Sequence, residues 1–399
     1  MTTVDEFPQS RTCPFAPPPA YARIREEEPV AQVRLPDGGR AWVVSRHEDV
    51  RTVLNDRRFS SDRRHPDFPE LTAGAAAAKR PDEEPTLISM DAPEHSVARR
   101  AVLGEFTVRR TEALRARVQE IVDERIDAVL AGPRPADLVE ELSLPIPSLV
   151  ICELLGVPYS AHAFFQERST ALIARGTPPL ERAAALSALR DYLGELIAEK
   201  ETDPPDDLLG RQIRTLREQG SYRRPALVGM GILLLVAGHE TTANMISLST
   251  VAFLRDPEQL ALIRADPTRT VAAVEEMLRY FTIVDAATAR LCVEDVEIGG
   301  QLIRAGEGVL ALTYSANRDP RAFTDPDELD IERGARHHVA FGFGPHQCLG
   351  QNLARMELQI VFDTLFRRIP TLALATDVDE LPFKDDAAIF GLHRLPVTW

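Results

Sequence analysis

Cysteine is scarce in this chain, and its few cysteines lie far apart. The four are Cys13, Cys152, Cys292 and Cys348. No two of them form a Cys-x-x-Cys pair, and their spacing is not typical of metal ligands. The sequence therefore indicates neither a framework of disulfides nor a zinc site.

A long hydrophobic run and an excess of basic residues are also lacking. The most apolar stretch, 232–237, is followed by His239 and Glu240 and is too short to cross a bilayer. The N-terminal residues have neither the basic nor the apolar segment of a secretory signal. A net charge of −15 argues against nucleic acid as a partner. We therefore expect a cytoplasmic protein that binds neither membranes nor nucleic acid.

The 399 residues contain no internal repeat and no linker between independent domains, so we expect one domain over residues 1–399. Helical patterns dominate from residue 94 to residue 276. Residues 29–46 predict a hairpin, and residues 288–312 predict further strands. The fold class expected is α+β, mostly α-helical, with a large helical part and a small β-rich part.

Cys348 has the most informative surroundings in the sequence. It lies in the segment FGFGPHQCLG (341–350), and a helix-forming run follows directly. Backbone N–H groups of such a turn and the start of a helix favour a thiolate. Gly342, Gly344 and Gly350 leave room for a flat ligand close to the backbone. This sulfur suits the axial ligation of a haem iron that promotes O–O cleavage; a buried, unreactive cysteine is the alternative.

The same segment resembles the haem-binding loop of the cytochrome P-450 family, Phe-Gly-x-Gly-x-His-x-Cys-x-Gly, with every fixed position filled. The resemblance implies the cytochrome P-450 fold and haem b with Cys348 as the ligand of its iron. The haem is expected to be non-covalent, because the chain has no Cys-x-x-Cys-His sequence. The other haem-binding residues implied are Phe341, Gly342, His346 and Gly350.

A second group of chemical residues lies in an apolar helix expected over 225–254. Its segment AGHETT (237–242) is unfavourable for a helix, because glycine weakens it and threonine hydroxyls compete for the carbonyl one turn back. Such a helix can bend or widen into a groove for a small ligand, although a polar kink in a core helix is the alternative.

The segment 237–242 is similar to the oxygen-binding motif of the same family. Cleavage of O2 needs protons, which an alcohol backed by a carboxylate can deliver in a water-poor pocket. The resemblance therefore makes Thr241 the catalytic alcohol and Glu240 its acid. It places Ala237 and Gly238 in the cofactor site.

Haem carries two propionates, which need cations or imidazoles as partners. A helix is expected to begin after Pro93, with His95 and Arg99 on one face. On these residues alone, a solvated helix start is the alternative. The resemblance assigns His95, Arg99, Arg290 and His346 to the propionates, where guanidinium–carboxylate pairs are strong.

Glu276 and Arg279 are three residues apart on an expected helix and can pair. By itself such a pair is typical of a solvated surface. Its place in the chain resembles the Glu-x-x-Arg helix of the family, and residues 325–333 resemble the segment that supplies a second arginine, Arg333. The implied buried cluster has a structural role, to fix the Cys348 loop.

The resemblance implies a monooxygenase that inserts one atom of O2 into a lipophilic small molecule, a hydroxylation in secondary metabolism. Residues 144–158 resemble the actinobacterial branch of the family, and a macrolide or a terpenoid is the substrate class expected. No Gly-x-Gly-x-x-Gly is present, so electrons from NAD(P)H must come through a ferredoxin and its reductase. We expect a monomer. The alternatives are a peroxide-driven peroxygenase, disfavoured by the intact Glu240–Thr241 pair, and a non-catalytic haem sensor.

The positions expected by resemblance to face the substrate are mostly apolar, which suits a lipophilic molecule. Several of them can instead be plain core residues. In the family, loops equivalent to 71–85 and 176–179 lie over the pocket. The positions are Leu87, Ile88, Leu233, Leu234, Ala237, Ile283, Val284, Ala286, Ile389 and Phe390.

The segment 99–117 holds six arginines against two glutamates, in contrast to the acidic whole. Ferredoxins are acidic, and complementary charge raises the rate of association. We expect the ferredoxin to dock there, with Arg109 and Arg110 in contact; a solvated face without a partner is the alternative.

Overall fold

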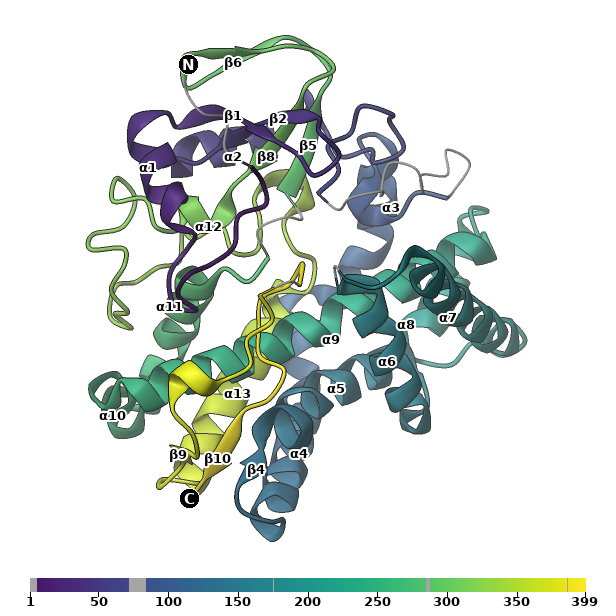
Figure 1. Ribbon diagram of the computed structural model, residues 1–399. Helices are drawn as coiled ribbons and strands as arrows, with labels where there is room; N and C mark the ends of the chain where they lie inside the picture. The colour runs from purple at the N-terminus through teal and green to yellow at the C-terminus, as the bar shows by residue number, and fades with distance from the viewer. Residues whose placement is uncertain (1–5, 72–83, 175, 285–287, 386) are drawn as a thin grey trace. The chain divides into compact units, whose positions relative to one another are not determined.

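The computed structural model describes residues 6–71, 84–174, 176–284, 288–385 and 387–399 (Figure 1). The chain forms two compact units. We call them the β-rich unit (Met1–Ala98, Leu278–Leu329, Ala335–Cys348) and the helical unit (Arg99–Met277, Asp330–Gly334, Leu349–Trp399). The expectation of a single domain stays a prediction.

The β-rich unit contains a five-stranded sheet in the order β1-β2-β8-β5-β3, and a separate hairpin of β6 and β7. The predicted strand pairs in 29–46 and 288–312 are confirmed. The strands are β1 Val30–Arg34, β2 Arg40–Val44, β3 Phe59–Ser60, β5 Ala289–Cys292, β6 Val296–Ile298, β7 Gln301–Ile303 and β8 Gly308–Ala311. The helices beside them are α1 Pro19–Glu27, α2 His47–Asn55 and α12 Thr313–Ala316.

Alternation along the strands gives this sheet two apolar faces. On one face Val43 of β2 packs in a core with Ile24 of α1. On the other face Val44, the next residue, packs with Val53 of α2. Because successive side chains of a strand point to opposite sides, helices cover both faces of the sheet.

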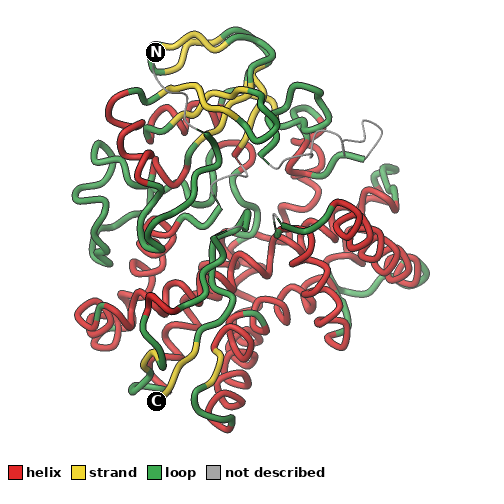
Figure 2. Tube along the Cα trace, viewed as in Figure 1, coloured by secondary structure: helices red, strands yellow, loops and turns green. Residues whose placement is uncertain are grey.

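The helical unit is built from long helices, and Figure 2 shows how little strand it contains. Its helices are α4 Val108–Ala131, α5 Pro145–Leu155, α6 His162–Ile173, α7 Pro179–Lys200, α8 Leu208–Glu218, α9 Arg224–Arg255, α10 Pro257–Ala265 and α13 Gln351–Arg368. A small sheet joins β4 Ala136–Asp137, β10 Pro396–Thr398 and β9 Ala373–Leu374. Two further helices, α3 Glu94–Leu103 and α11 Thr270–Phe281, contribute residues to both units.

Short helical turns connect these elements. The 3-10 turns are η2 Leu87–Ser89, η3 Gly104–Phe106, η5 Tyr159–Ala161, η6 Pro267–Arg269, η8 Gly344–His346 and η9 Val378–Glu380, and η4 Val139–Ser143 is a π-helical turn.

The core helix of the helical unit is α9, which is contacted by α5, α7 and α13. By length and composition it could cross a membrane, but 56% of its apolar window is buried inside the protein. Phe253 of α9 packs edge-on against Phe362 and Phe366 of α13, with ring centroids 5.5 and 5.4 Å away. The predicted helix over 225–254 is confirmed, as is the α+β class with helix dominant.

Candidate functional site

The loop that ends at Cys348 is fixed by its own backbone. The N–H of Cys348 donates to the carbonyl of Phe341 at 2.8 Å, and the N–H of Gln347 donates to that of Gly344 at 3.1 Å. Cys348 itself is exposed. A thiol at the end of a rigid loop and open to its surroundings has the access that a metal ligand needs.

Two glycines of this loop adopt the left-handed backbone, each with φ +70°. A Cβ at Gly344 would lie 2.8 Å from the carbonyl oxygen of Leu54, so α2 leaves no room for a side chain there. At Gly342 no neighbouring atom would be closer than 3.9 Å, and only its backbone conformation requires glycine. Arg51 of α2 also lies over the ring of Phe343, 4.2 Å from its centroid.

The β-rich unit contains three of the residues predicted for the propionates, and it brings two of them into contact. The rings of His95 and His346 lie 4.0 Å apart between centroids. Arg290 of β5 is only 6% exposed, and its Nη1 donates to the carbonyl of Ala289 at 2.8 Å. Burial, followed by the charge of Arg63, lowers the pKa of Arg290 to about 10. A buried guanidinium suits a propionate, and the imidazole of His346 in the glycine-rich loop, next to that of His95, suits the other.

The residues of the predicted glutamate–arginine cluster are all buried or nearly so. In the helical unit, Nε of Arg333 lies 3.2 Å from Oε1 of Glu276, which also accepts a hydrogen bond from the N–H of Asp330 at 3.0 Å. In the β-rich unit, the guanidinium of Arg279 is fully buried and donates to three backbone carbonyls of the segment 317–328 at 2.7–3.1 Å. These bonds fix loops, as a structural role requires.

On α9, Thr241 donates its hydroxyl to the carbonyl of Ala237 at 2.8 Å, the back-bond that the sequence predicts. The helix nevertheless remains α-helical from Arg224 to Arg255, so the widening expected there is not observed. Ala237 is exposed and Thr241 is half-buried, whereas Glu240 is buried. Gly238 packs against α5, where an added Cβ would meet Ile151 at 3.2 Å.

Glu240 forms a buried ion pair. Nζ of Lys384 lies 2.5 Å from its Oε1 and also donates to Oδ1 of Asn244 at 3.1 Å. Within the described residues, the carboxylate therefore bonds to Lys384 and Asn244 rather than to Thr241. Burial lowers the pKa of the neighbouring His239, whose Nε2 is 3.8 Å from the carboxylate, and this favours the neutral imidazole.

Sequence reasoning missed both partners of Glu240. Asn244 follows it by four residues on one helix, a spacing that could have indicated the contact. Lys384 is 144 residues away in the sequence, and no local pattern marks it.

The positions predicted to face the substrate differ in burial. Ala286 lies outside the described residues, as does most of the segment 71–85. Ile283 and Phe390 are buried, at 7% and 4% exposure, and Ile88 is 46% exposed. The half-buried ones are Leu87, Leu233, Leu234, Val284 and Ile389.

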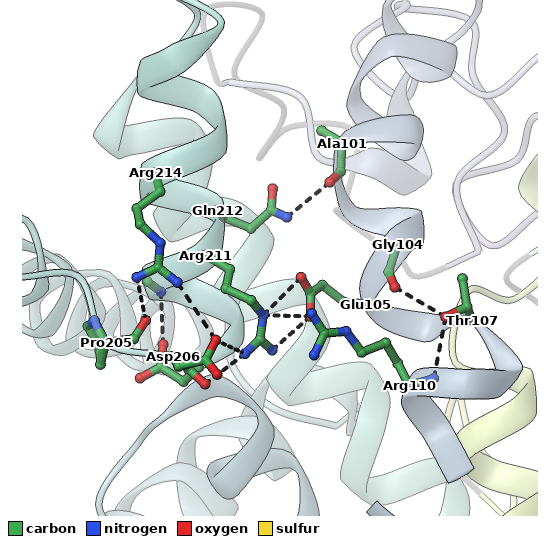
Figure 3. A network of polar contacts seen from close by, with 12 residues as sticks. Ala101, Gly104, Glu105, Thr107, Arg110, Pro205, Asp206, Arg211, Gln212 and Arg214 are labelled. Atoms are coloured by element: carbon green, nitrogen blue, oxygen red, sulfur yellow. Dashed lines mark hydrogen bonds and ion pairs between the residues drawn. The ribbon is translucent and has the colours of Figure 1, made fainter. Parts of the chain in front are cut away.

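The basic segment 99–117 is partly neutralised by ion pairs. Arg115 pairs with Glu112 at 2.7 Å. In Figure 3, Glu105 accepts from Arg211 of α8, with the shortest contact at 2.7 Å, and Arg110 stands on the first turn of α4. Arg109 and Arg110 are both exposed.

Known proteins that are similar to this chain indicate one family. The family model described as cytochrome P-450 matches residues 182–396. Pentalenic acid synthase of Streptomyces avermitilis is 50% identical over 393 residues, 98% of this chain and 97% of that protein. The crystal structure of cytochrome P-450 MoxA from Nonomuraea recticatena has a TM-score of 0.93 and 58% identity, covering 99% of this chain and 98% of that one. The structure of the mycinamicin VIII C21 methyl hydroxylase MycCI from Micromonospora griseorubida, bound to mycinamicin VIII, has a TM-score of 0.92 and 40% identity, covering 99% and 100%.

Proposed function

The chain belongs to the cytochrome P-450 family, and we propose that this monooxygenase hydroxylates a lipophilic secondary metabolite with electrons from a ferredoxin. The observation that carries the proposal is the Cys348 loop, with its exposed sulfur and its closure by the 2.8 Å bond from Cys348 N–H to the Phe341 carbonyl.

Family membership implies haem iron with a cysteine thiolate, and O2 as co-substrate. When bound, the haem supplies the activation of O2. Cys348 is the residue proposed to bind its iron, with Phe341, Gly342, Gly350, Ala237 and Gly238 also in contact with the cofactor.

The proposed anchors of the propionates are His95, His346, Arg290 and Arg99. Arg290 supports this assignment best, because it is a cation at 6% exposure whose hydrogen bond in the described part of the chain goes to a backbone carbonyl. A buried charge of this kind is stabilised when a carboxylate binds to it.

The residues proposed to handle protons are Thr241 and Glu240. Thr241 is half-buried on α9 beside the exposed Ala237, so its hydroxyl can exchange its bond to the Ala237 carbonyl for one to a ligand. Glu240 is at 2% exposure, where a carboxylate can carry protons without admitting bulk water.

The substrate proposed is a lipophilic molecule of the macrolide or terpenoid kind. Support comes from the apolar side chains that are half-buried, such as Leu233, Leu234 and Ile389. It also comes from two relatives, a pentalenic acid synthase and a methyl hydroxylase of mycinamicin VIII.

The partners proposed are a ferredoxin and an NAD(P)H-dependent reductase, in the cytoplasm, with the enzyme as a monomer. The exposed Arg109 and Arg110 support docking of an acidic protein. The neutralisation of Glu105 by Arg211 leaves less negative charge beside them (Figure 3).

The test is reconstitution with a ferredoxin, its reductase and NAD(P)H under ¹⁸O2, after an optical titration has selected a binder from a lipophilic natural-product library. We expect one ¹⁸O atom in each hydroxylated product. A parallel reaction with hydrogen peroxide in place of the electron donors separates the alternatives. Turnover with peroxide but none with the electron donors and O2 supports the peroxygenase. Binding without turnover in either reaction supports the sensor.

A further inference from the structure

The ion pair between Glu240 and Lys384 is unusual for this chain. Only three of its 46 basic residues are lysines, Lys79, Lys200 and Lys384. The side chains of Glu240 and Lys384 are 3% and 11% exposed, so the pair is largely withdrawn from water. A buried carboxylate needs hydrogen-bond or ion-pair partners, because burial removes the water that would otherwise solvate it.

Lys384 is held in place by a short hairpin near the C-terminus, in which residues 383–384 pair with residues 391–392 and which we call the C-terminal hairpin. Its N–H donates to the carbonyl of Gly391 at 2.9 Å, and Phe383 pairs with Leu392 in an antiparallel bridge. The hairpin sits directly on α9, because a Cβ at Gly391 would lie 2.0 Å from Oδ1 of Asn244. The backbone bonds therefore place Lys384 beside α9, where its ammonium group contacts Glu240 and Asn244.

The same hairpin carries two of the positions predicted to face the substrate, Ile389 and Phe390. The ring of Phe390 stacks on that of Phe383, with centroids 5.8 Å apart. Near the tip, the N–H of Ala388 donates to the carbonyl of Ile173 at the end of α6. One hairpin thus combines candidate substrate contacts with the cation that pairs with Glu240.

We propose that Lys384 is a positioning residue for proton delivery: from the C-terminal hairpin it orients the Glu240 carboxylate, so that the carboxylate can accept protons from water and pass them towards Thr241. This inference rests on the relay role given to Glu240 under the proposed function. Each cycle of the relay is balanced. One proton enters at Glu240 and weakens its bond to Lys384, and the departure of that proton restores the ion pair.

The contact itself is tested by NMR of the holoenzyme labelled with [ε-¹³C]lysine. With only three lysines in the chain, the Lys384 signal is assigned by its loss in Lys384→Arg. We expect this signal to shift in Glu240→Gln while that of Lys200 stays in place. An unchanged Lys384 signal in Glu240→Gln overturns the proposal without any measurement of activity.

The role is tested by coupling, measured as product formed per NAD(P)H consumed, and by the solvent isotope effect on turnover of the substrate that the optical screen selects. Lys384→Met is expected to lower coupling several-fold and to enlarge the isotope effect, and Lys384→Arg is expected to restore most of both. Infrared spectra are expected to show a shifted carboxylate stretch in Lys384→Met, because Oε1 of Glu240 loses a hydrogen bond, and this shift is expected to be absent when Glu240→Gln is added.

The matched control is Lys200→Met. Lys200 pairs with Asp207 at similar exposure, 10% and 14% for the two side chains, but its pair lies at the C-terminal end of α7. Both Met variants break one lysine–carboxylate pair, so both lose comparable thermal stability. Only Lys384→Met is expected to lose coupling, and equal coupling in the two variants overturns the proposal.

Variants of Glu240 and of Lys384 distinguish the relay from the positioning role. If Glu240→Gln retains the coupling of the unmodified enzyme, the relay under the proposed function is wrong and the role of Lys384 falls with it. If Glu240→Gln loses coupling while Lys384→Met keeps it, the relay stands and only the positioning role is wrong.

Discussion

The Cys348 loop and the Glu240 site are both predicted from short motifs, but different physics holds each in place. The loop is fixed by a backbone bond within its own segment, from Cys348 to Phe341, and by α2 packed against Gly344. Glu240 is held by Lys384, which lies 144 residues away in the sequence. A short motif predicts the backbone geometry of its own segment. It does not predict which distant residue pairs with a buried charge.

Two buried glutamates, Glu240 and Glu357, show how much the partner of a buried carboxylate matters. Glu240 and Glu357 are each 2% exposed. Glu240 has the ammonium of Lys384, whereas Oε2 of Glu357 has no hydrogen-bond partner in the described part of the chain. Burial raises the pKa of Glu357 to about 8, which favours the neutral carboxyl.

The largest effect is expected from the loop, in Cys348→Ser. The reduced CO complex should lose the strongly red-shifted Soret band of thiolate ligation, and turnover should fall below detection, while haem binding is weakened but measurable. Cys13→Ser is the matched control, because Cys13 is also exposed. A normal CO spectrum in Cys348→Ser would remove this residue from the site.

The next largest effect is expected from glycine-to-alanine substitutions, which should cost more stability in the Cys348 loop than in α9. Gly344→Ala puts a Cβ 2.8 Å from the Leu54 carbonyl at a φ of +70°. The strained backbone alone costs about 1–3 kcal/mol, and the clash adds to it. In Gly238→Ala, in α9, the added Cβ lies 3.2 Å from Cδ1 and 3.3 Å from Cγ1 of Ile151, a side chain that can shift, and alanine favours a helix by about 1 kcal/mol.

Denaturant titration of the two alanine variants gives the measurement. Gly344→Ala should lose several kcal/mol of unfolding free energy, while Gly238→Ala stays within ~1 kcal/mol of the unmodified protein. Equal losses in both would mean that the loop is no more constrained than the helix.

The raised pKa of Glu357 predicts a dependence of stability on pH. The folded pKa of Glu357, about 8, lies above the ordinary value of 4.5. Its unfolded form therefore gives up its proton first, and the protein loses stability as the pH rises from about 4.5 to about 8. Each pH unit of that shift corresponds to about 1.4 kcal/mol.

Glu357→Gln should abolish this loss, so the variant gains stability over the unmodified protein as the pH approaches 8. The measurement is chemical denaturation at several pH values, with Glu26→Gln, an exposed residue of α1, as the control. A stability difference that does not change with pH contradicts the neutral state of Glu357.

Thr241→Ala tests the face of α9 that carries the proposed alcohol. Loss of the hydroxyl should leave haem and substrate binding intact but divert electrons to peroxide, with a several-fold fall in product per NAD(P)H. Thr250→Ala is the matched control, because Thr250 makes the same back-bond at 2.8 Å on the same helix, to Ile246. Equal coupling in the two variants would show that a back-bonded hydroxyl on α9 has no catalytic part.

The smallest effect is expected from Arg109→Glu with Arg110→Glu, which should raise the apparent ferredoxin KM a few-fold and flatten its salt dependence, with substrate affinity unchanged. The control is the double reversal of Arg34 and Arg40, an exposed cross-strand pair of β1 and β2. If both double variants respond alike, only net charge matters and the docking face lies elsewhere.

Much of this protein could be predicted from its sequence, because the signals were local. The hairpin in 29–46, the strands in 288–312 and the helix over 225–254 follow from side-chain periodicity and from turn residues. The back-bond from Thr241 to Ala237 follows from residue type and helical spacing. The family is indicated by the resemblance of short motifs, and comparison over nearly the whole chain shows it.

Only the tertiary structure decided which distant groups meet. The sequence marks Glu240 as chemically interesting, but Lys384 acquires its meaning from a hairpin that brings its ammonium to α9. The tertiary structure also decided which residues are buried. In the sequence Glu357 resembles any helical glutamate, but packing removes its water and raises its pKa. Backbone geometry depends on near neighbours in the chain, whereas desolvation and ion pairing depend on neighbours in space, which no local pattern encodes.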